Sequence, residues 1–182
     1  TKIMPSLSKG LEMFGLYEDL HYFIGRKPPN NWRKSWGRPY EKPSDFKRCI
    51  TFYNGTVVQL ISHDVNGDGR GVNSDWILGY EAALLDPKKL QENTDPTRRG
   101  TNTFMFKGHP FFGRRTYVSS TPITPHGRWM LKYEDKAREN PNDIYYHRGT
   151  CQFNLHNVRP GYLQEARQSA RQYWVFEAEY LG

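Results

Sequence analysis

The chain has 182 residues, of which 36% are hydrophobic and 15% aromatic, and its formal net charge is +7. This length suits one domain with a sizeable hydrophobic core, so a single domain is expected over residues 1–182. No apolar run approaches the length of a membrane-spanning helix, and two cysteines without a Cys-x-x-Cys pair exclude a disulfide framework and a zinc ribbon.

The first half of the chain predicts a helix followed by a β-hairpin. Apolar residues recur at helical spacing over Leu7–Ile24, which predicts one helix there. After a connection rich in Pro, Gly and Trp, strands are expected at Arg48–Tyr53 and Thr56–Ser62. Asn54 and Gly55 between them form the dipeptide that is typical of a tight hairpin turn. The chain begins with neither an initiator methionine nor a hydrophobic leader, so we expect a segment of a longer chain.

The second half predicts strands that alternate with helices. Strands are expected at Trp76–Leu78, just before Glu81, and at Arg114–Ser120. A short helix or turn is expected near Ala82–Leu90, and helices are expected at Arg128–Glu139 and Pro160–Gln172. This alternation predicts an α/β fold with a mainly parallel central sheet flanked by helices, and a ligand crevice at the carboxyl ends of the strands.

A loop rich in Asp, Asn and Gly follows the predicted hairpin. Its oxygen-bearing residues have the spacing of an EF-hand calcium loop and are Asp64, Asn66, Asp68 and Asp75. A strand precedes the loop where an EF-hand requires a helix, and Asp75 stands where a bidentate glutamate is usual. A polar turn between two strands is the simpler interpretation. A calcium-binding interaction module is therefore one alternative function.

A basic segment rich in tryptophan extends from Arg26 to Arg38. Its Lys and Arg residues are interleaved with Trp32 and Trp36, a combination that can follow phosphates and stack on bases. Prolines mark the segment as a surface loop, and basic surface loops are common. A noncatalytic basic DNA-binding domain is therefore the second alternative.

Five short motifs occur in order along the chain. They are Thr51-Phe52-Tyr53-Asn54-Gly55, Gly69-Arg70-Gly71, the strand that ends at Glu81-Ala82, Ser119-Ser120-Thr121-Pro122 with Gly127, and Glu177-Ala178-Glu179-Tyr180-Leu181-Gly182. In this order they resemble the ATPase domain of phage terminase large subunits, most clearly over Arg48–Gly182. The resemblance implies a partial P-loop-type ATPase domain that is the C-terminal portion of a terminase-like domain, without the nuclease domain.

The resemblance implies roles for individual residues. Glu81 would match the Walker B glutamate that orients the attacking water, and Arg70 an arginine finger that reaches a neighbouring subunit's nucleotide. The coupling motif, which senses the γ-phosphate, would be Ser119, Ser120 and Thr121. From spacing alone, each has a simpler interpretation as a solvated acid, a loop charge or a turn.

The resemblance also implies cofactors, partners and a location. These are ATP and Mg²⁺ in the full-length protein, double-stranded DNA, the portal protein, the small terminase subunit, a homo-oligomeric ring, and the host cell cytoplasm with transient attachment to the procapsid. No Gly-x-x-x-x-Gly-Lys-Ser/Thr motif is present, so this chain alone is expected neither to bind ATP tightly nor to hydrolyse it.

The predicted Walker B pair departs from the family pattern. It is normally Asp-Glu, whereas here it is Tyr80-Glu81. A phenol with a pKa of about 10 is a poor magnesium ligand at neutral pH. Asp75 is a candidate to hold the metal through water, but the sequence leaves the metal ligands open.

Overall fold

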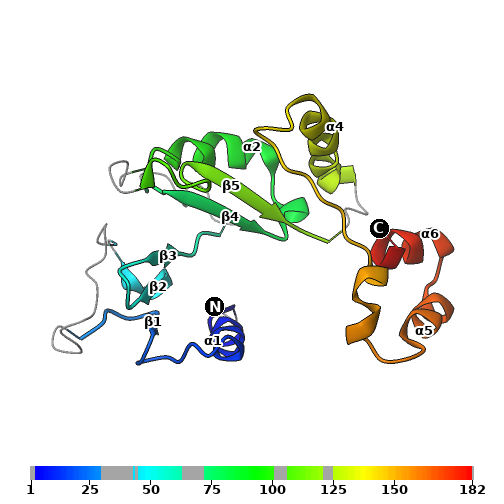
Figure 1. Ribbon diagram of the computed structural model, residues 1–182, viewed down its shortest axis with the longest axis horizontal. Helices are drawn as coiled ribbons and strands as arrows, with labels where there is room; N and C mark the ends of the chain where they lie inside the picture. Colours follow the sequence, from blue (N-terminus) through cyan, green and yellow to red (C-terminus); the bar gives the residue numbers. More distant parts are fainter. Residues whose placement is uncertain are drawn as a thin grey trace. The chain divides into compact units, whose positions relative to one another are not determined.

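The computed structural model describes residues 3–29, 43, 45–62, 72–100, 106–120 and 125–181 (Figure 1). Contacts divide the chain into two compact units, the first made of Thr1–Gly69 with Thr101–Lys107 and the second of Arg70–Gly100 with Gly108–Gly182. The single domain expected over residues 1–182 stays a prediction.

The first unit begins with α1 (Ile3–Met13), which is shorter than the predicted helix. The helix ends because Gly15 adopts a left-handed backbone with φ 72°. The Gly15 N–H donates to the Glu12 carbonyl at 2.9 Å, and the Leu16 N–H donates to the Leu11 carbonyl at 3.0 Å. These two bonds form a Schellman cap, which satisfies the last carbonyls of the helix. The prediction of one helix over Leu7–Ile24 was therefore wrong.

A three-stranded antiparallel sheet completes the first unit. Its order is β1 (Tyr22–Ile24), β2 (Cys49–Phe52) and β3 (Val57–Gln59), with the short 3₁₀ helix η1 (Phe46–Arg48) before β2. The predicted hairpin is confirmed, since β2 pairs antiparallel with β3 around the Asn54-Gly55 turn. Gly55 supplies the positive φ of 89° that this turn requires. The core of the sheet is buried and contains Tyr22, Phe23, Cys49, Ile50 and Thr51.

The second unit is built on two parallel strands, β4 (Trp76–Tyr80) and β5 (Arg114–Val118). The chain between them forms short helical segments, which are η2 (Ala82–Leu84), α2 (Pro87–Lys89), η3 (Leu90–Thr94) and η4 (Asp95–Thr97). After β5 come η5 (Pro125–Met130), α4 (Lys132–Glu139), η6 (Cys151–Asn157), α5 (Tyr162–Ser169), α6 (Tyr173–Phe176) and η7 (Glu177–Leu181). The helices predicted at Arg128–Glu139 and Pro160–Gln172 are confirmed in position, with shorter bounds.

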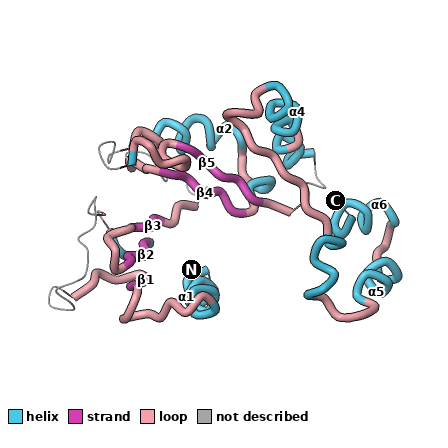
Figure 2. Tube along the Cα trace, viewed as in Figure 1, coloured by secondary structure: helices cyan, strands magenta, loops and turns pink. Residues whose placement is uncertain are grey.

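The predicted fold class was wrong. In the part of the chain that the structure describes, strands form one antiparallel sheet of three and one parallel pair, and no central parallel sheet of the P-loop type is present (Figure 2). The tight turn after β2 forces antiparallel pairing, because a parallel neighbour requires a long crossover. The chain between β4 and β5, residues 81–113, is long enough for such a crossover. Within the described ranges, no helix is long and apolar enough to cross a membrane.

One face of the β4–β5 pair is covered by side chains from the helical segments. Arg115 forms an ion pair with Asp95 of η4, and its Nη2 donates to the Tyr133 hydroxyl at 3.1 Å. The Tyr117 ring meets Trp129 edge-on, with centroids 5.6 Å apart. Burial in this cluster raises the pKa of Tyr117 to about 12. The helical segments therefore hold β5 through a half-buried network of charge and aromatic rings.

This network predicts a loss of stability at alkaline pH. The folded-state pKa of Tyr117, about 12, lies above the ordinary tyrosine pKa of 10.0, so the folded protein retains the phenol proton more tightly than the unfolded chain. The resulting stabilisation is complete below pH 10 and decreases as the pH rises towards 12. When the pH is raised from 9 to 11.5, the free energy of unfolding in urea should decrease less for Tyr117→Phe than for the wild type. Tyr145→Phe, at an exposed tyrosine, should retain the wild-type pH dependence. If the free energy of unfolding decreased equally with pH in Tyr117→Phe and in the wild type, Tyr117 would not be the source of this pH dependence.

Candidate functional site

The carboxyl ends of β4 and β5 bring two predicted motifs together. The strands are parallel and pair Tyr80 with Val118, so the residues that follow them emerge at the same edge. Glu81 follows β4, and Ser119 and Ser120 follow β5. Residues that are 38 and 39 positions apart in the sequence thereby become neighbours.

A hydrogen-bond network joins the Glu81 carboxylate to both serines. The Ser120 hydroxyl donates to Oε2 of Glu81 at 3.0 Å. The Ser119 hydroxyl and the Ser120 backbone N–H also point at Oε2, each at 3.4 Å. The 3.0 Å bond lies at the upper end of normal O–H···O lengths, whereas the 3.4 Å contacts are weak. All three donors approach the same oxygen, so they fix the direction of the carboxylate and leave Oε1 as its other acceptor.

Glu81 has a strained backbone, with φ 50° and ψ 47° in the left-handed region. This conformation turns the chain from β4 directly into η2, whose Ala82 and Ala83 are buried. The Ala83 backbone N–H donates to the Ser119 hydroxyl at 3.1 Å, so Ser119 bridges the start of η2 and the carboxylate. Non-glycine residues in this region cost free energy and cluster at functional sites. The sequence carries no signal for this strain, because glutamate gives no indication of a left-handed position.

Among the other predicted site residues, Asp75 is described by the structure and does not belong to this cluster. Asp75 precedes β4 and Glu81 follows it, so the five residues of the strand separate them by about 20 Å. Arg70, Thr121 and the calcium-loop residues Asp64, Asn66 and Asp68 lie outside the described residues, as does most of the basic segment after Arg26. Arg26 itself is ion-paired with Glu18 and Asp19.

The cluster does not fit a magnesium ion by itself. Magnesium prefers an octahedral shell of oxygen ligands and is usually held by one or two carboxylates together with substrate phosphates. Glu81 is the single carboxylate here, and both serine hydroxyls are engaged as donors to it. Across the described ranges, no group of three or more His, Cys, Asp or Glu residues is placed to hold a metal. The arrangement is instead suited to orient a small hydrogen-bond donor such as water.

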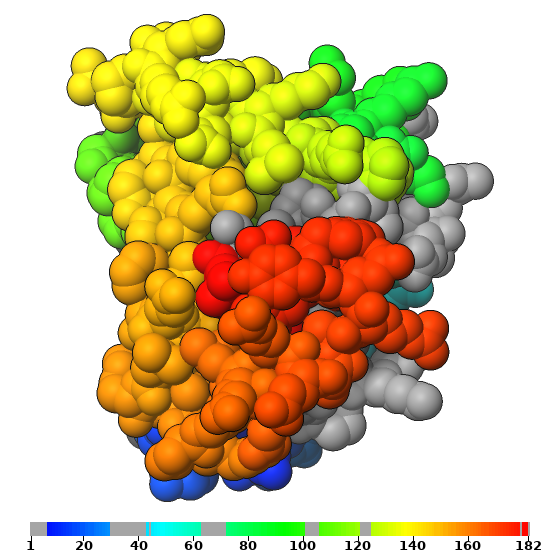
Figure 3. All heavy atoms as spheres, turned by 90° about the vertical axis from the view of Figure 1, so that its right-hand side faces the viewer, coloured from blue at the N-terminus to red at the C-terminus, as the bar shows by residue number. Residues whose placement is uncertain are grey.

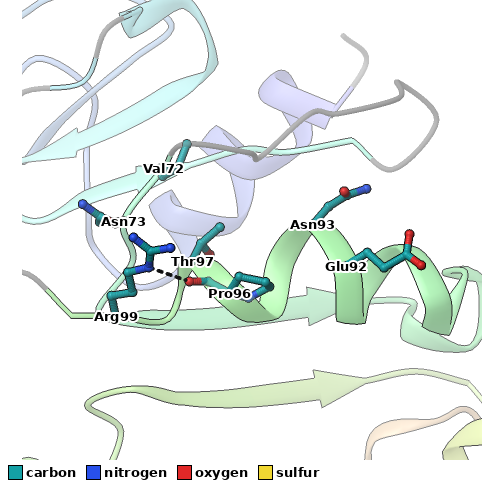
Figure 4. Close-up of a pocket in the computed structure, with 7 residues that line it drawn as sticks. All are labelled: Val72, Asn73, Glu92, Asn93, Pro96, Thr97 and Arg99. Atoms are coloured by element: carbon teal, nitrogen blue, oxygen red, sulfur yellow. Dashed lines mark hydrogen bonds between the residues drawn. The ribbon is translucent and has the colours of Figure 1, made fainter.

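A separate polar hollow lies beside the chain that leads into β4 (Figure 4). It has a volume of about 340 Å³ and is lined by Val72, Asn73, Glu92, Asn93, Pro96, Thr97 and Arg99. Figure 4 shows Arg99 turned back onto its own turn, where Nε donates to the Pro96 carbonyl at 3.2 Å. Glu81 does not line this hollow, which lies at the opposite end of β4.

No family model, no curated protein and no solved structure matches this chain.

The strain at Glu81 predicts an unusual order of stability among variants. Glu81→Gly and Glu81→Ala both remove the carboxylate and its hydrogen bonds, but only glycine adopts the left-handed backbone without a steric penalty. We expect Glu81→Gly to be more stable than Glu81→Ala by about 1 kcal/mol in urea unfolding. At Glu139, an exposed residue in the last turn of α4, the order should reverse, because glycine weakens helices. If Glu81→Ala were as stable as Glu81→Gly, the backbone at position 81 would not be left-handed.

Proposed function

We propose that this chain is part of a viral DNA-packaging motor of the terminase type, in which Glu81 orients the water that attacks the terminal phosphate of ATP. One observation supports the proposal most directly. The two motifs that the resemblance assigns to catalysis and to coupling lie at adjoining strand ends, and the Ser120 hydroxyl bonds the Glu81 carboxylate at 3.0 Å. The proposal places the motor in the host cell cytoplasm and transiently at the procapsid.

In this proposal the chemical task of Glu81 is to position a nucleophile. Phosphoryl transfer relies on a well-placed water more than on covalent catalysis. With Oε2 held by the serines, Oε1 accepts a hydrogen bond from the water and sets its direction of attack. ATP supplies the transferred phosphoryl group when it is bound, and the sequence contains no phosphate-binding loop. The assignment to this chain is therefore restricted to the carboxylate and its serines.

Ser119 and Ser120 connect the carboxylate to the rest of the unit. Ser119 accepts from the Ala83 N–H at 3.1 Å, so movement of the chain after β5 is transmitted to the start of η2. If the Glu81 carboxylate moved, the hydrogen bonds of both serines would change together, because both hydroxyls bond Oε2. This is the physical basis for a coupling role, with double-stranded DNA, the portal protein and the small terminase subunit as partners of an oligomeric ring.

Glu81→Gln tests the catalytic assignment in the complete motor protein that carries this chain. The amide keeps the size of the side chain but accepts a proton from water poorly, so ATP hydrolysis should fall at least about 100-fold. ATP affinity, measured by equilibrium binding, should remain within about threefold. Glu139→Gln, at an exposed glutamate on α4, is the matched control and should hydrolyse ATP at the wild-type rate. Unchanged hydrolysis in Glu81→Gln would remove Glu81 from catalysis.

Ser120→Ala tests the coupling assignment. Removal of the 3.0 Å hydrogen bond frees the carboxylate to rotate, so DNA packaging should slow by about tenfold, the equivalent of one hydrogen bond to a charged group. ATP hydrolysis should decrease less than packaging, so the amount of DNA moved per ATP should decrease. Ser120→Thr retains the hydroxyl and should restore most of the packaging rate. Equal losses of hydrolysis and packaging in Ser120→Ala would assign Ser120 to catalysis alone.

A further inference from the structure

Two exposed aromatic side chains after α4 have nearly parallel rings. The ring centroids of Tyr145 and His147 are 6.5 Å apart, and the ring planes differ by only 8°. Tyr145 is 88% exposed. Successive bases in a nucleic acid stack about 3.4 Å apart, so one ring inserted between two others requires about 6.8 Å. The distance of 6.5 Å between the Tyr145 and His147 centroids is close to this value.

The backbone sets this spacing. The segment after α4 runs as an extended trace in Figure 1, and it has neither helix nor strand assignment over residues 144–150. Tyr145 and His147 are exposed, whereas Tyr146 between them is half-buried. In an extended segment, residues two apart point the same way and lie about 6.6 Å apart. The extended backbone therefore accounts for the spacing of the two rings.

A hollow of about 460 Å³ adjoins the two rings and is shared with α4. Two arginines line it, Arg138 from α4 and Arg148 next to His147. Arg138 is ion-paired with Glu134 at 2.6 Å and with Asp135 at 3.2 Å. Arg148 takes part in no ion pair within the described part of the chain. In Figure 3, α4 and the segment that follows it both lie at the surface of the molecule, so a ligand can reach this hollow from solvent.

We propose that Tyr145 and His147 form a clamp for one unstacked nucleobase, and that Arg148 binds the phosphate of the same nucleotide. A base is flat and presents an aromatic face on each side, so it stacks on both rings at once. A guanidinium beside the two rings suits a phosphate, which it binds through charge and paired hydrogen bonds. Bases within a duplex are already stacked, so the clamp selects single-stranded nucleic acid or a free nucleotide. This inference is independent of the role of Glu81.

Fluorescence anisotropy with a labelled single-stranded oligothymidylate tests the clamp on the full chain. The wild type should bind the strand, and Tyr145→Ala should weaken binding by about tenfold or more, the loss expected for one stacked base. Tyr145→Phe keeps the aromatic face and should bind like the wild type. Tyr173→Ala, at another exposed tyrosine in α6, is the matched control and should leave binding unchanged. Arg148→Gln should weaken binding and reduce its salt dependence.

Two further probes identify the ligand and separate stacking from charge. An abasic strand of the same length carries the phosphates without the bases. Its affinity for the wild type should therefore be no higher than the affinity of oligothymidylate for Tyr145→Ala. Competition by adenosine monophosphate would identify a free nucleotide as the ligand. Competition by unlabelled oligothymidylate alone would identify a single strand. Either result would support the clamp. Wild-type affinity in Tyr145→Ala, or tight binding of the abasic strand, would overturn it.

Discussion

Parallel pairing of β4 with β5 is the constraint on which the candidate site depends. Both strands end at the same edge, so Glu81 and Ser120 meet although they are 39 residues apart in the sequence. A shift of the register by one residue would turn the end of one strand to the opposite face and separate the carboxylate from the hydroxyls. The hydrogen bond from Trp76 Nε1 to the Thr116 hydroxyl, at 3.2 Å, adds a side-chain link across the pair.

Side-chain fit fixes this register on the covered face. Gly79 pairs with Tyr117, and a Cβ at position 79 would lie 2.6 Å from the Tyr117 ring, so only glycine admits the ring at this position. Arg115, two residues before Tyr117, points the same way and pairs with Asp95. The Tyr117 ring packs over Gly79, and the Arg115–Asp95 ion pair is half-buried. Together these two contacts specify one register of β4 and β5. The geometry at Glu81 is therefore set by contacts on the body of the strands, some residues away from the site.

Local signals in the sequence predicted local structure, and nonlocal pairing was the part that they missed. The hairpin at Asn54-Gly55 was predictable because the turn residues themselves impose it. The end of α1 at Gly15 also depends on a local signal, but apolar residues continue at helical spacing beyond it as far as Ile24. The run Trp76–Leu78 predicted a strand buried in a sheet. The structure instead leaves Leu78 56% exposed, because a run of large apolar residues specifies a strand without specifying its neighbours.

The energetics at Glu81 explain how the carboxylate keeps its position without a ligand. The left-handed backbone costs about 1 kcal/mol. A hydrogen bond to a charged group contributes about 1.5 kcal/mol or more, and the 3.0 Å bond from Ser120 is one such bond. Buried Ala82 and Ala83 tie the start of η2 to the unit, so the strained residue cannot relax without exposing them. The order of motifs led to Glu81, Ser119 and Ser120, but this balance of strain and hydrogen bonding is visible only in three dimensions. A carboxylate held in this way loses little conformational entropy when it orients a water, which is the property that the proposed role requires.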